Sequence, residues 1–137
     1  MNESKVTTKL IQALNAIPCC FARKRHGNIF SAGDPDIALC YRGRTILIEL
    51  KMPGGALSDL QAIMLDRWQA AGAVCVLGVW DSAQKAFCFH SNKSWKKYVG
   101  NIKSTMLRAG CGAYQNVRAA DMQEVLDDWY THNSKAH

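Results

Sequence analysis

Two short runs of consecutive apolar residues, separated by Arg42-Gly43, constrain the fold of this chain more than any other feature. Ile37-Ala38-Leu39 precedes this dipeptide and Ile46-Leu47-Ile48 follows it. A strand with one solvent-facing side alternates apolar and polar residues, whereas strands covered on both faces are apolar in succession. Residues 36–41 and 44–51 are therefore predicted to be central strands of a sheet that lies between helices.

A turn at Arg42-Gly43 would place Asp36 opposite Glu49 at the open end of this hairpin. Opposite residues share a face, with Cβ atoms about 4.5–5.5 Å apart, so two carboxylates would meet there. They would repel each other unless a divalent cation neutralised both. Lys51, two residues after Glu49, points to the same face. Arginine rarely adopts the positive φ that such a turn needs, so a bulge or longer loop that shifts the register stays an alternative.

Apolar periodicity and turn signals predict the remaining elements. Helices are expected at 4–17, 58–71 and 121–130, a basic helix at 93–108, and strands at 19–25, 73–80 and 86–90, the last at an edge of the sheet. The second helix is expected to face inward with Leu60, Met64, Trp68 and Ala71. We expect one α/β domain over 1–137, with a core at about 1–90 and a C-terminal helical extension at about 92–137.

Charge and hydropathy narrow the classes of function. The 17 Lys and Arg residues against 11 acids give a net charge of +6, which favours a polyanionic partner such as nucleic acid. No apolar run approaches the roughly 20 residues of a membrane helix. The polar N-terminal residues are unlike a secretory signal. We therefore expect a cytoplasmic protein of a bacterial host, and its compact size hints at a phage origin.

The six cysteines do not have the spacing of a zinc site, because none forms a Cys-x-x-Cys or Cys-x-x-His pair. Cys19 and Cys20 are adjacent, which is a poor geometry for chelation, and Cys75 and Cys88 lie inside apolar runs. We expect small buried residues in a reducing compartment rather than disulfides or a structural metal.

Gly33-Asp34-Pro35-Asp36, the hairpin, and Ile48-Glu49-Leu50-Lys51 together resemble the signature of PD-(D/E)XK nucleases. Gly54-x-x-Leu57-Ser58-x-x-Gln61, a helix, and Ala71-Gly72-Ala73-Val74 extend the pattern, which then looks like the VRR-NUC branch and, more distantly, archaeal Holliday-junction resolvases. The resemblance covers 33 to about 80 well, the first helix loosely and the chain after 92 hardly at all. It implies a restriction-endonuclease-like α/β core, a mixed central sheet flanked by helices.

The resemblance also implies a metal-dependent active site. Asp36, Glu49 and the main-chain carbonyl of Leu50 would bind Mg²⁺ or Mn²⁺. Lys51 would orient or activate the attacking water and offset charge in the transition state. A metal in that position lowers the pKa of water and stabilises charge on phosphate oxygens. The implied reaction is hydrolysis of a phosphodiester to a 5′-phosphate and a 3′-hydroxyl.

Three further polar residues have competing interpretations. Gln61 matches the helix glutamine that supports the site in relatives, but Ser58-x-x-Gln61 is also a capping box. Glu3 matches an acid of the first helix that helps bind the metal, but it also suits the dipole of a helix N-terminus. Asp34 falls opposite Lys51 in the predicted register, as a salt-bridge partner or as an extra acid near the metal.

Basic residues are candidates for phosphate contacts, with Trp95 and Tyr98 interleaved, although a solvated basic face is the alternative. They are Arg23, Lys24, Arg25, Lys93, Lys96 and Lys97. His26 and His90 are expected at the surface or at strand ends rather than as ligands.

The leading interpretation is an endonuclease that recognises branched DNA or a four-way junction by shape. Symmetric cutting of a junction needs two active sites, hence a homodimer. Alternatives are a DNA-binding protein that does not cut, a sequence-specific restriction-type nuclease, and a cysteine-based metal or redox protein.

Overall fold

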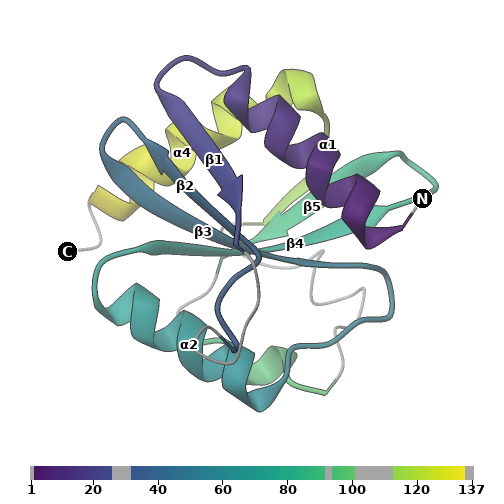
Figure 1. The fold of residues 1–137 in the computed structure, drawn as a ribbon, viewed down its shortest axis with the longest axis vertical. Coiled ribbons are helices and arrows are strands. Elements are labelled where there is room, and N and C mark those ends of the chain that lie inside the picture. Colours follow the sequence, from purple (N-terminus) through teal and green to yellow (C-terminus); the bar gives the residue numbers. More distant parts are fainter. Residues whose placement is uncertain (1, 26–31, 92–93, 101–112, 135–137) are drawn as a thin grey trace.

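A computed structural model describes residues 2–25, 32–91, 94–100 and 113–134 of the chain. A six-stranded sheet with the order β1-β2-β3-β4-β5-β6 lies between helices (Figure 1). The elements are α1 Glu3–Asn15, β1 Cys20–Lys24, β2 Ile37–Tyr41, β3 Arg44–Lys51, α2 Asp59–Ala70, β4 Val74–Asp81, β5 Ala86–His90, the 3₁₀ helix η1 Lys96–Tyr98, β6 Ala113–Val117, the 3₁₀ helix η2 Ala119–Asp121, and α4 Met122–Ser134. Among the described strands, β3 and β4 alone pair in parallel, so the predicted mixed sheet is confirmed.

The hairpin of β2 and β3 has the predicted register, from Tyr41 opposite Arg44 to Ile37 opposite Ile48. The turn has φ 50° at Arg42 and 85° at Gly43, so both central residues are left-handed, as in a type I′ turn. The main-chain N–H of Arg42 also donates to the carbonyl of Cys19, 3.1 Å away. The register shift that an arginine in this position could have caused is therefore absent.

The two faces of the sheet belong to different cores. α1 and α4 cover one face, where they pack with Ile46 and Ile48 of β3. α2 and η1 cover the other face, where they pack with Leu47 (Figure 1). Because side chains alternate along a strand, Glu49 and Lys51 point to the same side as Leu47, toward α2. β3 is thus covered on both faces, as its continuous apolar run predicts.

The C-terminal part of the chain differs from the sequence predictions. β5 is an inner strand rather than an edge, because β6 pairs with it at Phe87 opposite Val117 and Phe89 opposite Tyr114. The expected helical extension therefore also contributes a strand. That strand is short and irregular, with φ 55° at Asn116. Its sequence therefore lacks the alternation of apolar and polar residues that would predict a strand. Of the predicted helix at 93–108, residues 96–98 form η1, and 93 and 101–108 lie outside the described residues.

The two later α-helices differ in how well their spacing predicts the buried face. α4 buries the expected residues, Met122, Val125, Leu126 and Trp129. α2 buries Ala62 and Leu65, whereas Leu60, predicted to face inward, is 45% exposed, and Ala71 lies exposed after the helix. Apolar residues lie on more than one side of α2, so spacing alone does not define its inward face.

In the described ranges, no helix is both long and apolar enough to cross a membrane.

Candidate active site

Asp36 lies immediately before β2 and is held by two main-chain N–H groups. Its carboxylate Oδ2 accepts a hydrogen bond from the N–H of Leu50 at 3.0 Å. Its own carbonyl accepts one from the N–H of Arg25 at 2.7 Å. The hairpin register, continued by one residue, sets Asp36 opposite Glu49, as the sequence predicts.

Glu49 is a carboxylate inside the core, with 1% of its surface exposed. Its Oε2 lies 3.4 Å from Nζ of Lys51 and 3.2 Å from Nε2 of Gln61. Its Oε1 is buried and has no hydrogen-bond partner among the described residues. Burial and, second, the charge of Asp36 raise the pKa of Glu49 to about 8, against a smaller lowering effect of Lys51.

This arrangement fits a divalent cation. A buried carboxylate oxygen without a partner, beside a second carboxylate, is an unfavourable environment that a hard cation would relieve. Among the described residues, no three His, Cys, Asp or Glu side chains form a metal-holding cluster. The carboxylate donors are thus the pair Asp36 and Glu49. Mg²⁺ in particular is often held by one or two carboxylates, with water and substrate phosphates as its other ligands.

Lys51 ends β3 on the same face as Glu49, and 18% of its side chain is exposed. The ammonium group can therefore reach both the buried carboxylate and a group arriving from solvent. Asp34 does not pair with Lys51, although the predicted register sets them opposite each other. Its Oδ2 lies 3.3 Å from Nη2 of Arg25, and its Oδ1 accepts a hydrogen bond from Nε1–H of Trp68 at 3.2 Å.

Gln61 makes contacts that fit both of the interpretations that the sequence left open. In the capping box of α2, its Oε1 accepts from the N–H of Ser58 at 2.9 Å, and its own N–H donates to Oγ of Ser58 at 3.1 Å. Its Nε2 donates a hydrogen bond to Oε2 of Glu49. One side chain therefore caps the N-terminus of α2 and bonds to the buried carboxylate.

Glu3 is not brought to these acids. It is the first residue of α1, which packs on the opposite face of the sheet from Glu49 and Lys51. No interaction within the described residues joins Glu3 to Asp36 or Glu49. Its metal-binding role stays a prediction that the geometry does not support.

The basic residues named from the sequence lie in two groups. Arg23 and Lys24 are exposed on β1, whose end adjoins Asp36, and Lys96 and Lys97 are exposed on η1. The guanidinium of Arg25 is paired with Asp34, and Lys93 lies outside the described residues.

The aromatic residues between these lysines cannot stack on bases. Trp95 and Tyr98 each have 0% of their surface exposed and belong to the core under α2. Their spacing therefore reflects packing of η1 rather than a nucleic-acid platform. His90, at the end of β5, is buried as well, and His26 lies outside the described residues.

The cysteines are less uniformly buried than expected. Cys75 is buried, which raises its pKa to about 12, but Cys19 and Cys40 are exposed. All five described cysteines are free thiols, and Cys111 lies outside the described residues.

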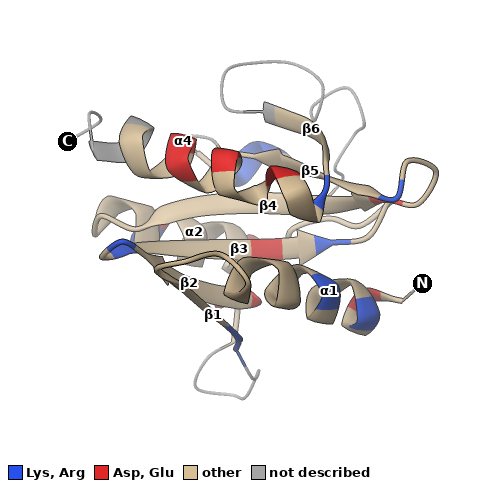
Figure 2. Ribbon diagram, turned by 90° about the horizontal axis from the view of Figure 1, so that it is seen from above, with Lys and Arg blue, Asp and Glu red and all other residues tan. Residues whose placement is uncertain are grey.

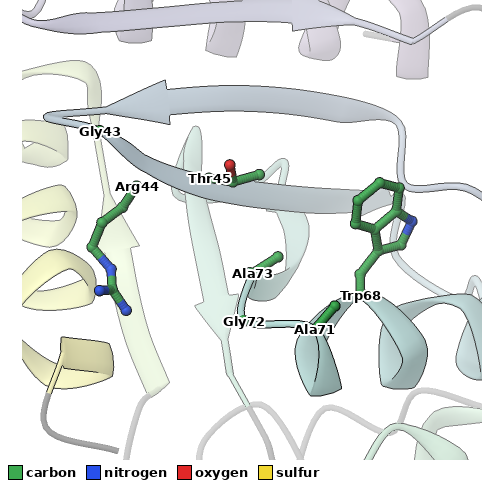
Figure 3. Close-up of a pocket in the computed structure, with 7 residues that line it drawn as sticks. All are labelled: Gly43, Arg44, Thr45, Trp68, Ala71, Gly72 and Ala73. Atoms are coloured by element: carbon green, nitrogen blue, oxygen red, sulfur yellow. The ribbon is translucent and has the colours of Figure 1, made fainter. Parts of the chain in front are cut away.

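A hollow of about 300 Å³ lies beside the hairpin turn (Figure 3). Its lining comprises Gly43, Arg44, Thr45, Trp68, Ala71, Gly72 and Ala73. Arg44 begins β3 and Lys51 ends it, so this hollow is at the other end of the strand from the acids. It offers no carboxylate, histidine or thiol for catalysis.

No protein-family model matches the chain, and no curated protein matches it. Among solved structures, the chain is similar to Hjc, a Holliday junction resolvase of the archaeal hyperthermophile Archaeoglobus fulgidus. The TM-score is 0.55 at 18% identity, over 74% of this chain and 86% of that one. At this identity the likeness shows the fold, and the expected fold class is confirmed: the chain has a restriction-endonuclease-like α/β fold.

Proposed function

We propose that this protein is a metal-dependent DNA endonuclease of the VRR-NUC branch of the PD-(D/E)XK nucleases. The observation that carries the proposal is the buried Glu49 carboxylate beside Asp36, with Oε1 unpartnered and Nζ of Lys51 3.4 Å from Oε2. A carboxylate buried in a core with an oxygen that lacks a partner is destabilising, so its presence beside a second acid calls for a ligand such as a cation.

We assign each residue of the site a role that its contacts or the family resemblance support. Asp36 and Glu49, with the carbonyl of Leu50, would hold Mg²⁺ or Mn²⁺, which lowers the pKa of water and stabilises charge on the phosphate. Lys51, partly exposed beside Glu49, would place its positive charge against the scissile phosphate and orient the attacking water. Gln61 fixes the Glu49 carboxylate through Nε2.

DNA is the substrate that charge favours. The net charge is +6. Acids gather on α4, whereas Lys and Arg are spread over other elements, among them α1 and the end of β1 (Figure 2). Exposed Arg23 and Lys24 lie near the end of β1, where Arg25 bonds to the main chain of Asp36. Phosphate contacts of this kind position DNA without reading its sequence.

Branched DNA is the preferred substrate in this proposal, with the four-way junction first. Its support is the likeness in fold to a Holliday junction resolvase. Two symmetric cuts in a junction require two copies of the site, so the active form would be a homodimer.

The test is cleavage of labelled DNA by the purified protein with Mg²⁺, with Mn²⁺ and with a chelator. The substrates are a four-way junction, a flap, a linear duplex and a single strand. Asp36→Ala and Lys51→Ala should each abolish metal-dependent cutting, whereas Glu124→Gln, an exposed acid of α4, should cut normally.

The outcomes separate the alternatives. Cutting that is fastest on the junction and lost in both variants supports the proposal. Fragments with defined ends from linear duplex would indicate a sequence-specific nuclease. Tight DNA binding by the unmutated protein with no cutting in either metal would reject the enzyme and leave a DNA-binding protein.

A further inference from the structure

Asp34 connects two elements that the chain order keeps apart. Nε1–H of Trp68 on α2 donates to its Oδ1 at 3.2 Å, and Nη2 of Arg25, next to β1, lies 3.3 Å from its Oδ2. The guanidinium also lies over the Trp68 ring, 5.5 Å from the ring centroid. The Asp34 side chain is only 11% exposed, so water screens these contacts weakly.

Further contacts hold the segment that carries Asp36. The main-chain N–H of Arg25 donates to the carbonyl of Asp36 at 2.7 Å. Gly33, at φ +81°, lies against α2 so closely that a Cβ there would be 2.6 Å from Cγ of Leu60. Residues 33–36 therefore contact α2 on one side and the end of β1 on the other.

α2 thereby positions both acids of the site. Gln61 near its N-terminus holds Glu49, and Trp68 holds Asp34. At 1.5 Å per residue these two contacts are about 10 Å apart along the helix. A rigid helix that contacts the neighbourhood of both carboxylates would fix their separation, which a cation shared between them requires.

We infer that Asp34, clamped by Trp68 and Arg25, is a positioning residue that holds the Asp36 carboxylate where it can share a metal with Glu49. This inference rests on the proposed function. It also assigns the Arg25 charge to Asp34 rather than to the DNA backbone. Asp34 itself does not touch the metal or the scissile phosphate.

The test measures Mn²⁺ binding to the full chain without DNA, by calorimetry. Trp68→Phe removes one N–H and keeps the ring, Asp34→Asn keeps the acceptor for Trp68 but not the charge, and Arg25→Gln removes the charge from the other side. Each should bind Mn²⁺ about 10-fold more weakly, the lower end of the range for residues behind metal ligands. Arg67→Gln, on the exposed side of α2, is the control and should bind normally.

Thermal unfolding of the metal-free proteins separates positioning from simple stability. If Asp34 acts by positioning, Trp68→Phe and the unmutated protein should unfold at similar midpoints. The cleavage activity of Trp68→Phe should recover at saturating Mn²⁺, and its KM for DNA should be unchanged. Unchanged Mn²⁺ affinity in Trp68→Phe and Asp34→Asn would overturn the inference alone. Failure of the unmutated protein to bind Mn²⁺ would overturn the proposed function as well.

Discussion

At the scale of single residues, Glu49 is the acid that the fold buries among the described residues. The sequence predicts this, because Glu49 interrupts a run of apolar residues in a strand covered on both faces. Its partner Asp36 could be predicted too, from the hairpin register. The link from Asp34 to Trp68 could not be predicted, because it joins positions in different elements whose relative placement depends on packing.

The raised pKa of Glu49 makes the stability of the metal-free protein depend on pH. Folding raises this pKa from 4.5 to about 8, so the folded state retains a proton that the unfolded state has lost. The contribution of Glu49 to the free energy of unfolding is fully present below about pH 4.5. It is lost as the pH rises toward 8, by on the order of 1 kcal/mol per pH unit. Glu49→Gln, which cannot ionise, should lack this loss.

The measurement is urea unfolding in chelator at several pH values between 5 and 9, for the unmutated protein and Glu49→Gln. The difference between the two free energies of unfolding should shift in favour of the glutamine variant up to about pH 8 and then level off. Titrating groups that do not interact with Glu49 cancel in this difference. Parallel curves would show that Glu49 is ionised throughout.

At the scale of elements, the hairpin was predictable and the inward face of α2 was not. Continuous apolar runs define the hairpin strands, and opposite pairing then follows from one turn. α2 has apolar side chains on several sides, so Leu60 and Ile63 are left exposed at 45% and 51%. The structure shows which side faces the sheet, because Ala62 and Leu65 are buried and Gln61 bonds to Glu49.

The Arg42-Gly43 turn leaves room for a stabilising substitution. Arg42 has φ 50°, a left-handed conformation that costs most residues roughly 1–2 kcal/mol and that asparagine tolerates. Arg42→Asn loses the contact of the guanidinium with the Tyr41 ring, 5.4 Å away, which is worth about 0.5 kcal/mol when exposed. The net expectation is a gain of about 0.5 kcal/mol in chemical denaturation. Arg42→Ala keeps the strain and loses the ring contact, so it should lose stability, and the reverse order of the two variants would contradict this account.

The two roles of Gln61 can be separated by variants at the start of α2. Ser58→Ala removes the cap hydrogen bond to the N–H of Gln61 and should cost about 1 kcal/mol of stability with little change in cleavage. Gln61→Glu can still complete a capping box but places an acceptor against Glu49. It should keep most of the stability and lose at least about 10-fold in Mn²⁺ affinity. Denaturation and Mn²⁺ titration on both variants check this, and an equal loss of affinity in Ser58→Ala would refute it.

At the scale of the whole molecule, the sequence predicts the order of elements through β5 and not the way the C-terminal part completes the sheet. β6 has no alternating pattern, and its place beside β5 depends on pairing between distant residues. α4 packs in the core that it shares with α1. There the rings of Trp129 and Phe89 meet edge-to-face, with their centroids 5.3 Å apart. The hydroxyl of Tyr41 donates to Asp127, which ties α4 to the hairpin.

These long-range contacts mean that the segment after residue 112 should be required for folding. A chain truncated at 112 would expose the edge of β5 and uncover the Phe89 face that Leu126 and Trp129 bury. We expect no cooperative unfolding transition in that chain and aggregation at micromolar concentration, because an unpaired apolar edge is prone to association. Leu126→Ala in the full chain, at 0% exposure, should cost about 2–5 kcal/mol and still unfold cooperatively. If the truncated chain instead unfolds cooperatively near the midpoint of the full chain, β6 and α4 are not needed to complete the core.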